Sequence, residues 1–589
     1  MTEVLEAALQ AYHRGEPRVA SHLLKEALEK WRHRPDGWVL FGAALKAEGN
    51  YPGAEQAYKE AIRLLPNFAD AWQNLGNLYA ASGLHGEAAD AYQQALTATV
   101  GSIDASNAAI LLAGSAFAAG RLEAAFAALD RALKQAPNNG SAFNQRGKLL
   151  WEIGDTESAV TAFRDATRAE PDNPLFAVNL LLVSQFSETA DEASLAHLAR
   201  QAAGLIAGQV DPALCVDYAP PSGPGQERIR VAYLSSDFRH SAPGHFIHGI
   251  LAGHDRSRFN VFALSTIPGG DGWTEVLKRH IDHWEEVSSL NDAALTRRIR
   301  QLGIHILVDL NGYTGGHRLG ALAARAAPVQ VSWLGYEGST QLPEMDVLMG
   351  DWQVTPPANS ACHSERVVRL PFDFACYRAP DYAPGVATTP ALSRGYVTFG
   401  SFNKLAKLGP ATLRLWARVL RRVPGSRLLL KWRHAPSALA SERILGILMQ
   451  EGIARERIEF RDASPYPEML GEYANIDIAL DPFPFSGGAT TCDALWMGAP
   501  VVCLLGKRFA SNHTASHLRA AGLPELVAES EDQYEDICAT LAADPAALDR
   551  LRQTLRPQMA LSPLCNDRLF MTTVERHFRE LLEGVNWAP

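Results

Sequence analysis

The sequence of 589 residues predicts an α-superhelix of short repeats followed by two doubly wound α/β domains that face a cleft. Two patterns support this fold class. Small and large apolar residues recur with a period near 34 residues over the first third of the chain. Further along, short apolar runs alternate with segments of helical spacing, the arrangement of a parallel sheet covered by helices. A chain of this length is expected to hold about three or four units, each with its own core.

Five glycines set the register of the repeats: Gly15, Gly49, Gly83, Gly120 and Gly154, which are 34, 34, 37 and 34 residues apart. An alanine follows each glycine at five and at twelve residues, and a larger apolar residue follows at nine. We interpret the small residues as points where helices approach and the larger ones as the groups that fill the gap. Pro66, Pro137 and Pro171 each follow the second helix of a unit, where proline ends a helix without losing a bond.

This pattern resembles a tetratricopeptide array of about five helix pairs over residues 1–185, with trailing helical sequence to residue 206. Such arrays coil into a superhelix whose concave surface holds extended peptides. The expected partner of residues 1–206 is therefore a protein or peptide. The alternative is a scaffold or a dimerisation arm, so a homo-oligomer stays open.

Two proline-rich stretches divide the rest of the chain. Residues 207–227 form a linker before the first α/β domain, residues 228–378, whose expected strands are 228–238, 259–265, 304–312 and 328–336. Residues 379–395 form a second linker before the second α/β domain, residues 396–589, with expected strands at 396–402, 426–432, 457–461, 476–483 and 499–506. A final helix, about 565–582, is expected to pack back against the body. Open α/β sheets bind ligands at the carboxyl ends of their strands, which places the cleft there.

The composition argues against several classes of protein. The chain carries 55 basic and 65 acidic residues, a formal charge of -10, without a Lys/Arg cluster, so no nucleic-acid partner is expected. Seven scattered cysteines without a C-x-x-C pair indicate neither a disulfide framework nor a zinc ribbon. No apolar run approaches the roughly 18 residues of a membrane span. We expect a cytoplasmic protein that does not bind membranes.

The stretch "SGGATTCDALWMGAPVV", Ser486 to Val502, joins an apolar strand to a helix. Amide groups at a helix start are unpaired and attract anions, and small residues such as Gly488 and Ala489 let a phosphate come close. Thr490 and Thr491 add hydroxyl donors, and Asp493 lies one turn further, where it could take a ribose hydroxyl. The alternative is an ordinary helix cap, since Thr and Gly favour that position anyway.

Lys407, in "FGSFNKLAKLGP", follows the first strand of the second domain, on the cleft side, where an ammonium group could meet a diphosphate. The alternative is a solvated loop lysine. The sequence has no G-x-G-x-x-G at the start of either domain and no G-x-x-x-x-G-K-[ST], which argues against a nicotinamide cofactor or an ATP motor. No D-x-D pair is placed to bridge a metal ion to a diphosphate.

Several long motifs carry a family resemblance: "RVAYLSSDF", "ILVDLNGYTGG", "AAPVQVSWLGYEGST", "VTFGSFNKLAKLGP", "DIALDPFPFSGGATTCDALWMGAPVV" and "SPLCN". Together they resemble the catalytic region of the O-linked N-acetylglucosamine transferase and SPINDLY family. The similarity covers about residues 228–585, and tetratricopeptide repeats precede this region in the family as they do here.

The resemblance implies a GT-B type fold and an inverting, metal-independent transfer of a sugar from a nucleotide donor to Ser or Thr hydroxyls of proteins. Lys407 matches the family lysine on the donor diphosphate, Thr490 a phosphate-contacting threonine, and Asp493 the acidic residue on the ribose. Asn403, Gly488, Ala489 and Thr491 complete the expected nucleotide-sugar site. The nucleotide sugar is then a co-substrate, and no cofactor or metal is expected.

Three departures from the family pattern affect the base and the donor. Ser241 stands where the animal-type enzymes have a histidine near the sugar, with His240 one position earlier and His245 matching a later family histidine. The general base is therefore open between His240, His245 and a route through water. The uracil-contacting Lys and His fall near Tyr466 and Met469, and the histidine before the threonines has become Gly488.

The donor and the class of protein stay open at this point. UDP-N-acetylglucosamine is favoured as the commoner family activity. GDP-fucose, used by plant SPINDLY members, and the CMP-linked sugars of bacterial flagellin transferases are alternatives. Two other classes remain: a repeat scaffold whose transferase half has decayed, and a small-molecule or lipid-linked glycosyltransferase of the same fold, against which the repeats argue.

Overall fold

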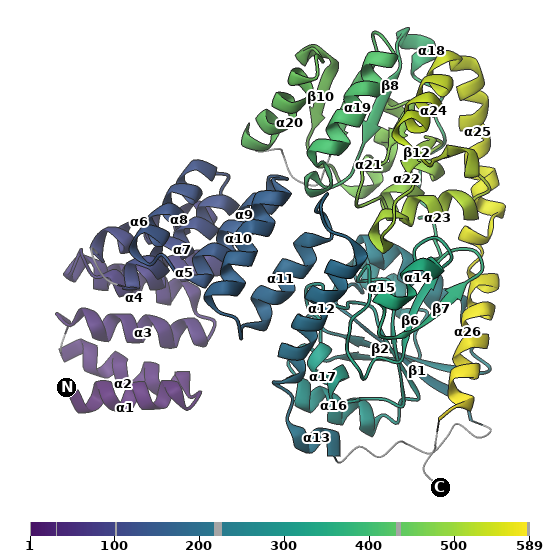
Figure 1. The fold of residues 1–589 in the computed structure, drawn as a ribbon. Coiled ribbons are helices and arrows are strands. Elements are labelled where there is room, and N and C mark those ends of the chain that lie inside the picture. Colours follow the sequence, from purple (N-terminus) through teal and green to yellow (C-terminus); the bar gives the residue numbers. More distant parts are fainter. Residues whose placement is uncertain (1, 31, 100–102, 217–226, 432–437, 586–589) are drawn as a thin grey trace. The chain divides into compact units, whose positions relative to one another are not determined.

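The computed structural model describes residues 2–30, 32–99, 103–216, 227–431 and 438–585 (Figure 1). These fall into two compact units. The first comprises Met1–Leu150 and Thr161–Pro171, and the second comprises Trp151–Val160 and Asp172–Pro589. Of the predicted segments, residues 217–226 of the first linker, residue 432 of an expected strand and residues 586–589 lie outside the described residues.

Ten helices form the predicted repeat region, in five successive pairs: α1 (Thr2–His13) with α2 (Pro17–Lys30), α3 (Pro35–Ala47) with α4 (Tyr51–Leu64), α5 (Ala69–Ala81) with α6 (His85–Ala98), α7 (Ile103–Ala118) with α8 (Leu122–Gln135), and α9 (Gly140–Glu152) with α10 (Thr156–Ala169). This confirms the expected number of helix pairs. Each pair has the helix-turn-helix form of a repeat that buries its apolar face only against its neighbours.

The repeat glycines serve two different purposes. The register glycines, such as Gly49 (φ +83°) and Gly83 (φ +74°), lie in the turn within a pair, and no atom lies within 4 Å of where a Cβ would be. They are needed for the left-handed backbone conformation rather than for close packing. Gly42 and Gly76 are the close approaches: a Cβ there would lie 2.6 Å and 2.7 Å from the rings of Tyr58 and Tyr92. The large residues of the repeat therefore pack against Gly42 and Gly76, and not against the glycines that set the register.

The first lobe, which starts at β1, is built on a parallel sheet of seven strands in the order β3-β2-β1-β4-β5-β6-β7. Its strands are β1 (Ile229–Ser235), β2 (Phe259–Ser265), β3 (His283–Glu286), β4 (Ile306–Asp309), β5 (Val329–Ser332), β6 (Val347–Asp351) and β7 (Arg366–Leu370). The crossover helices α14 (Ala242–Gly253), α15 (Gly272–Lys278), α16 (Asp292–Gln301) and α17 (Leu319–Ala323) connect the strands. The strand order reverses between β1 and β4, as in a doubly wound fold.

The second lobe repeats the plan with six parallel strands in the order β10-β9-β8-β11-β12-β13. They are β8 (Thr398–Ser401), β9 (Arg427–Lys431), β10 (Ile458–Arg461), β11 (Ile478–Leu480), β12 (Val501–Leu504) and β13 (Val527–Ala528). The helices include α19 (Pro410–Arg422), α20 (Ala438–Gln450), α21 (Tyr466–Glu472), α22 (Ala489–Trp496), α23 (His513–Ala520), α24 (Glu531–Ala543) and α25 (Pro545–Leu561). Here the order reverses between β8 and β11, so the segments after these two strands lie side by side at the switch point where such folds bind ligands.

Two helices that the sequence division assigned to residues 1–206 pack with the first lobe instead. α11 (Pro174–Ser184) is apolar on nearly every side, and α12 (Glu192–Ala207) is amphipathic. Their apolar residues share one buried cluster with Ala232, Leu234 and Phe262 of the first sheet. An all-apolar helix needs cover on every side, which a single neighbouring helix cannot supply, so α11 lies over the sheet.

The final helix, α26 (Asp567–Glu583), also changes the predicted boundaries. The division placed it with residues 396–589, whereas its apolar face packs into the core of the first lobe; Phe570, for example, stacks on Trp333 with ring centroids 6.0 Å apart. A buried polar link adds to this docking. Nδ1 of His254 lies 2.8 Å from Oε1 of Glu575 on α26, which accepts, and Nε2 of His254 lies 2.7 Å from the Tyr233 hydroxyl. The expected packing against the body is confirmed, and the partner is the first lobe.

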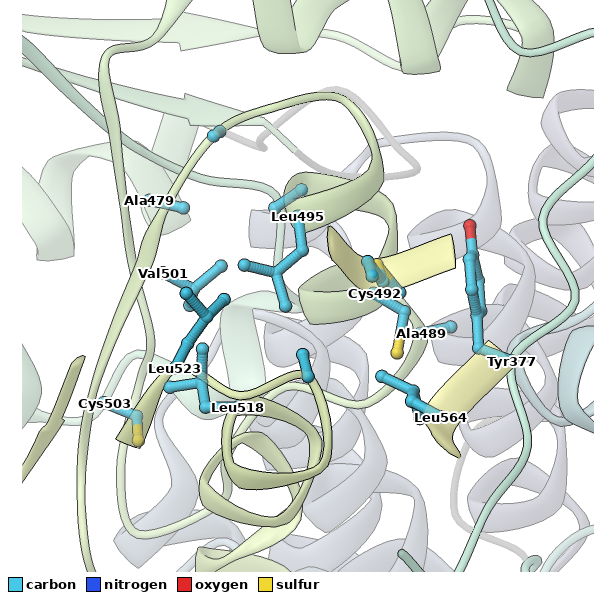
Figure 2. Close-up of a cluster of buried hydrophobic side chains, with 14 of the residues drawn as sticks. Tyr377, Ala479, Ala489, Cys492, Leu495, Val501, Cys503, Leu518, Leu523 and Leu564 are labelled. Carbon is cyan, nitrogen blue, oxygen red and sulfur yellow. The ribbon is translucent and has the colours of Figure 1, made fainter. Parts of the chain in front are cut away.

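A large apolar cluster lies beneath α22 and combines residues of both lobes. Figure 2 shows part of it, with Tyr377 beside Ala489 and Cys492 of that helix. α22 therefore starts from a rigid base. Within the described segments, no helix combines the length and apolar character needed to cross a bilayer, and no group of three or more His, Cys, Asp or Glu side chains is arranged to hold a metal ion.

Candidate functional site

The loop between β11 and α22 ends in a helix start without a side-chain cap. Gly488 occupies the capping position, as the ordinary-cap alternative also allows, and it has no side chain to accept from the first-turn amides. Gly487 leaves no room for a side chain, because a Cβ would lie 2.4 Å from Oγ1 of Thr491 and 2.9 Å from Oδ1 of Asp481. Ala489 is buried directly behind. The predicted small residues thus form a close-packed turn that presents backbone groups.

Lys407 lies directly against this turn. Its Nζ donates to the carbonyl oxygen of Ser486 at 2.7 Å and to Oδ1 of Asn403 at 3.3 Å, and it lies 4.6 Å from the ring centroid of Phe485. Burial lowers the pKa of Lys407 to about 8, while the nearby carboxylates of Asp481 and Glu337 oppose this shift. The side chain is therefore a fixed cation at pH 7 rather than the solvated loop lysine of the alternative interpretation.

Asn403 connects the two segments that follow β8 and β11. Its Oδ1 accepts from the Thr490 hydroxyl at 3.1 Å as well as from Lys407. The structure therefore brings Lys407, Asn403 and Thr490 together, as predicted. Thr491 differs from the prediction: its buried hydroxyl bonds to that of Thr514 at 2.8 Å, so it holds α22 to α23 rather than offering a donor to a ligand.

Asp493 lies one turn into α22 and is buried. Its Oδ1 accepts from the hydroxyl of Tyr377 at 2.7 Å and from that of Tyr466 at 2.8 Å. Burial raises the pKa of Asp493 to about 6, and the two tyrosine hydroxyls oppose that shift. The acidic residue is thus ionised at pH 7 and held in one orientation by a residue from each lobe.

The two candidate histidines lie together on the Tyr466 side of the site. His245, on α14, is buried and stacks on Tyr466 with centroids 4.7 Å apart, and His240 contacts the same ring at 4.6 Å. The backbone amide of His240 donates to Asp271 at 2.8 Å. Ser241, which stands where the animal-type enzymes have a histidine, caps α14 by accepting from the amide of Gly244 at 3.1 Å. A chain of contacts thus runs from the histidines through Tyr466 to Asp493.

Several residues of the site were not predicted. Asp481 follows β11, accepts from the Gly487 amide at 2.7 Å, and has its pKa raised to about 7 by burial. Tyr473 donates to the carbonyl oxygen of Thr490 at 3.1 Å. A small cavity in the second lobe is lined by Asn403, Thr490, Asp481 and Tyr473, among others. Asp481 could have been found from the sequence, because it stands at the end of an apolar strand, "IDIALDPF". No pattern in the sequence marks Tyr473.

Comparison with known proteins identifies the family. A model described as Glycosyl transferase family 41 matches residues 212–377 and 388–574, more than half of the chain. The chain belongs to this family. Tetratricopeptide repeat models match residues 42–83, 69–99 and 116–181 of this family 41 protein, which confirms the resemblance of the repeats.

Curated relatives and a solved structure agree with this assignment. The "Probable UDP-N-acetylglucosamine--peptide N-acetylglucosaminyltransferase SPINDLY" of Petunia hybrida is 37% identical over 365 residues, and that of Arabidopsis thaliana 38% over 359. Each match covers 60% of this chain and 39% of the relative, so the matched region spans about two fifths of those proteins. An O-GlcNAc transferase mutant from Thermobaculum terrenum superimposes with a TM-score of 0.75 at 30% identity, covering 93% of this chain and 97% of the other. The predicted fold class of repeats followed by two Rossmann-like lobes is thereby confirmed.

Proposed function

We propose that this family 41 protein is a protein O-glycosyltransferase that transfers a sugar from a nucleotide donor to Ser or Thr hydroxyls. The observation that carries the proposal is the Lys407 ammonium, held 2.7 Å from the Ser486 carbonyl oxygen at the turn that opens α22. Negative charge builds on a diphosphate as its bond to the sugar breaks. A preorganised ammonium group and unpaired helix amides stabilise charge that develops only then, which is how a site lowers a barrier.

The same geometry supports a metal-independent reaction, and we propose the inverting outcome from the family resemblance. Lys407 and the start of α22 supply the positive potential that a divalent ion would otherwise provide. Asp493, fixed by Tyr377 and Tyr466, is placed one turn away to accept a ribose hydroxyl. We propose that the reaction uses no cofactor beyond the nucleotide sugar. We also propose that the protein is cytoplasmic, and the support for this is its seven unpaired cysteines.

The donor is proposed to be UDP-N-acetylglucosamine, the sugar nucleotide in the names of the plant relatives. GDP-fucose is the alternative, because Tyr466 stands near the position of a family uracil contact. Tyr466 packs on His245 and donates to Asp493, so this part of the site offers an aromatic face rather than the ammonium of a lysine. A scaffold with a decayed transferase half would not need Lys407, Asn403 and Thr490 held together, and this favours the enzyme.

Labelled donors test the proposal directly. We expect the purified chain, incubated with cell lysate and labelled UDP-N-acetylglucosamine, GDP-fucose or a CMP-linked sugar in turn, to label proteins with one donor and to be unaffected by EDTA. Thermal shift with UDP, GDP and CMP should rank the nucleotides in the same order, because a ligand that binds only the native state raises the melting temperature. If the protein labels nothing with any donor, the alternative of a scaffold with a decayed transferase half is correct. Loss of labelling in EDTA would contradict metal independence.

The acceptor is proposed to be a protein held by the repeats. Deleting residues 1–66, which span α1 to α4, removes two terminal helix pairs from an array whose units contact only their neighbours. We expect kcat/KM for a protein acceptor to fall by about tenfold or more, while donor hydrolysis stays within about twofold of the intact chain. Equal losses in both assays would show that the repeats do not select the acceptor.

A further inference from the structure

Glu337 is a half-buried acidic residue in the loop that follows β5. The loop is strained at both ends, since Leu334 (φ +63°) and Gln341 (φ +57°) adopt the left-handed conformation without being glycine. Such a conformation is unfavourable for a residue with a side chain and persists only where the surroundings impose it, most often at functional sites. Gly335 allows the tight path, because a Cβ there would lie 1.9 Å from the carbonyl oxygen of Leu310.

Buried hydrogen bonds hold this loop on both sides of Glu337. The Tyr336 hydroxyl accepts from Nε2 of Gln185 at 3.1 Å. On the other side, the buried carboxylate of Glu365 accepts from the backbone amide of Thr340 at 2.6 Å and also from the hydroxyls of Ser339 and Thr340. The backbone at Glu337 is therefore placed by its neighbours, as a reacting group requires.

A run of packing contacts links the loop that carries Glu337 to Lys407. Gln185 touches Tyr336, and its neighbour Phe186 stacks on Phe485 with centroids 4.3 Å apart and planes at 13°. The ring of Phe485 in turn lies under the ammonium group of Lys407 at 4.6 Å. The charges of Lys407 and Lys404 both act on the Glu337 carboxyl. The loop after β5 is thus linked to Lys407 through Gln185, Phe186 and Phe485, and the Glu337 carboxyl and the Lys407 ammonium group interact electrostatically.

We propose that Glu337 is the general base of the transfer, an inference that rests on the proposed function. The carboxylate takes the proton from the acceptor Ser or Thr hydroxyl as the hydroxyl oxygen bonds to the anomeric carbon. The bond from that carbon to the diphosphate oxygen breaks, and its electron pair leaves with the nucleoside diphosphate beside Lys407. Protonated Glu337 then returns its proton to solvent, which restores the carboxylate.

The electrostatics suit this role. Burial raises the pKa of Glu337 to about 7, and Lys407 and Lys404, the charged groups acting on it, oppose the rise. Asp481 acts on Lys407 from within the second lobe. A base whose pKa is close to the working pH is the most effective one. His245, by contrast, is packed among the rings of His240, Trp273 and Tyr466.

The Glu337→Gln variant tests the inference, since it keeps the size of the side chain and removes its basicity. With the donor that labels proteins, we expect kcat/KM for the acceptor to fall by about a hundredfold or more. The rise of wild-type kcat/KM through pH 7 should disappear, because that rise reports ionisation of the carboxyl, whereas His245→Gln and His240→Gln should retain it. Glu275→Gln, which removes an exposed charge from the first lobe, is the matched control and should match the wild type.

A second readout does not depend on turnover. Calorimetric titration with UDP and GDP should give several-fold tighter binding to Glu337→Gln than to the wild type at pH 8, and a smaller difference at pH 6, because the ionised carboxyl repels the diphosphate. Unchanged affinity at both pH values overturns the placement of Glu337 in the site. Labelling by wild type and variant alike overturns the base role alone. A wild type that labels nothing overturns the proposed function, and the base role with it.

Discussion

Replacing Lys407 with alanine is expected to leave a folded protein whose sugar transfer is at least about a hundredfold slower, the cost of removing one preorganised charge from a developing anion. Within the described residues, the ammonium group makes hydrogen bonds to Ser486 and Asn403, so its loss leaves the turn between β11 and α22 in place. The rate of transfer at saturating donor and acceptor measures the loss of activity, and circular dichroism shows whether the variant is folded. Lys507→Ala, an exposed lysine of the same lobe, is the matched control.

The titration of Lys407 adds a second, independent signature. Because the folded protein lowers its pKa to about 8, the charged form is lost as the pH rises through 8, and kcat/KM, which reports the free enzyme, should fall in that range. Lys407→Arg keeps a positive charge at any accessible pH, so whatever activity it retains should lack this fall. A Lys407→Ala variant that is folded and turns over normally would refute the diphosphate site.

Replacing Asp493 with asparagine is expected to weaken UDP or GDP binding by about tenfold to a hundredfold, the range for a hydrogen bond to a charged group. Asparagine keeps an oxygen for Tyr377 and Tyr466, so α22 should stay anchored. Burial raises the pKa of Asp493 to about 6; wild-type affinity should therefore fall as the pH drops through 6, while the variant shows no such change.

Calorimetry over pH 5 to 8 measures both effects of the Asp493 substitution. Asp536→Asn, an exposed carboxylate on the second lobe, is the matched control. Affinity of the Asp493→Asn variant equal to that of the wild type would show that Asp493 only anchors the two tyrosines.

Much of this site could be predicted because its residues are close in sequence to the strands that carry them. Lys407 and Asn403 follow β8, and Thr490 and Asp493 follow β11, so adjacency of the two strands at the switch point is enough to bring them together. The same reasoning could not tell the role of Thr491 from that of Thr490. Which of two neighbouring hydroxyls faces the ligand depends on α23, where Thr514 lies.

Periodicity and motif order by themselves determined the repeat array, the two parallel sheets and the family, because each is encoded by spacing along the chain. Only the tertiary structure decided that α11, α12 and α26 belong to the core of the first lobe, since the surface that covers an apolar helix is contributed by distant segments. The link between the loop of Glu337 and Lys407 was decided in the same way. It depends on Gln185, Phe186 and Phe485, whose packing brings together three parts of the chain that no local pattern connects.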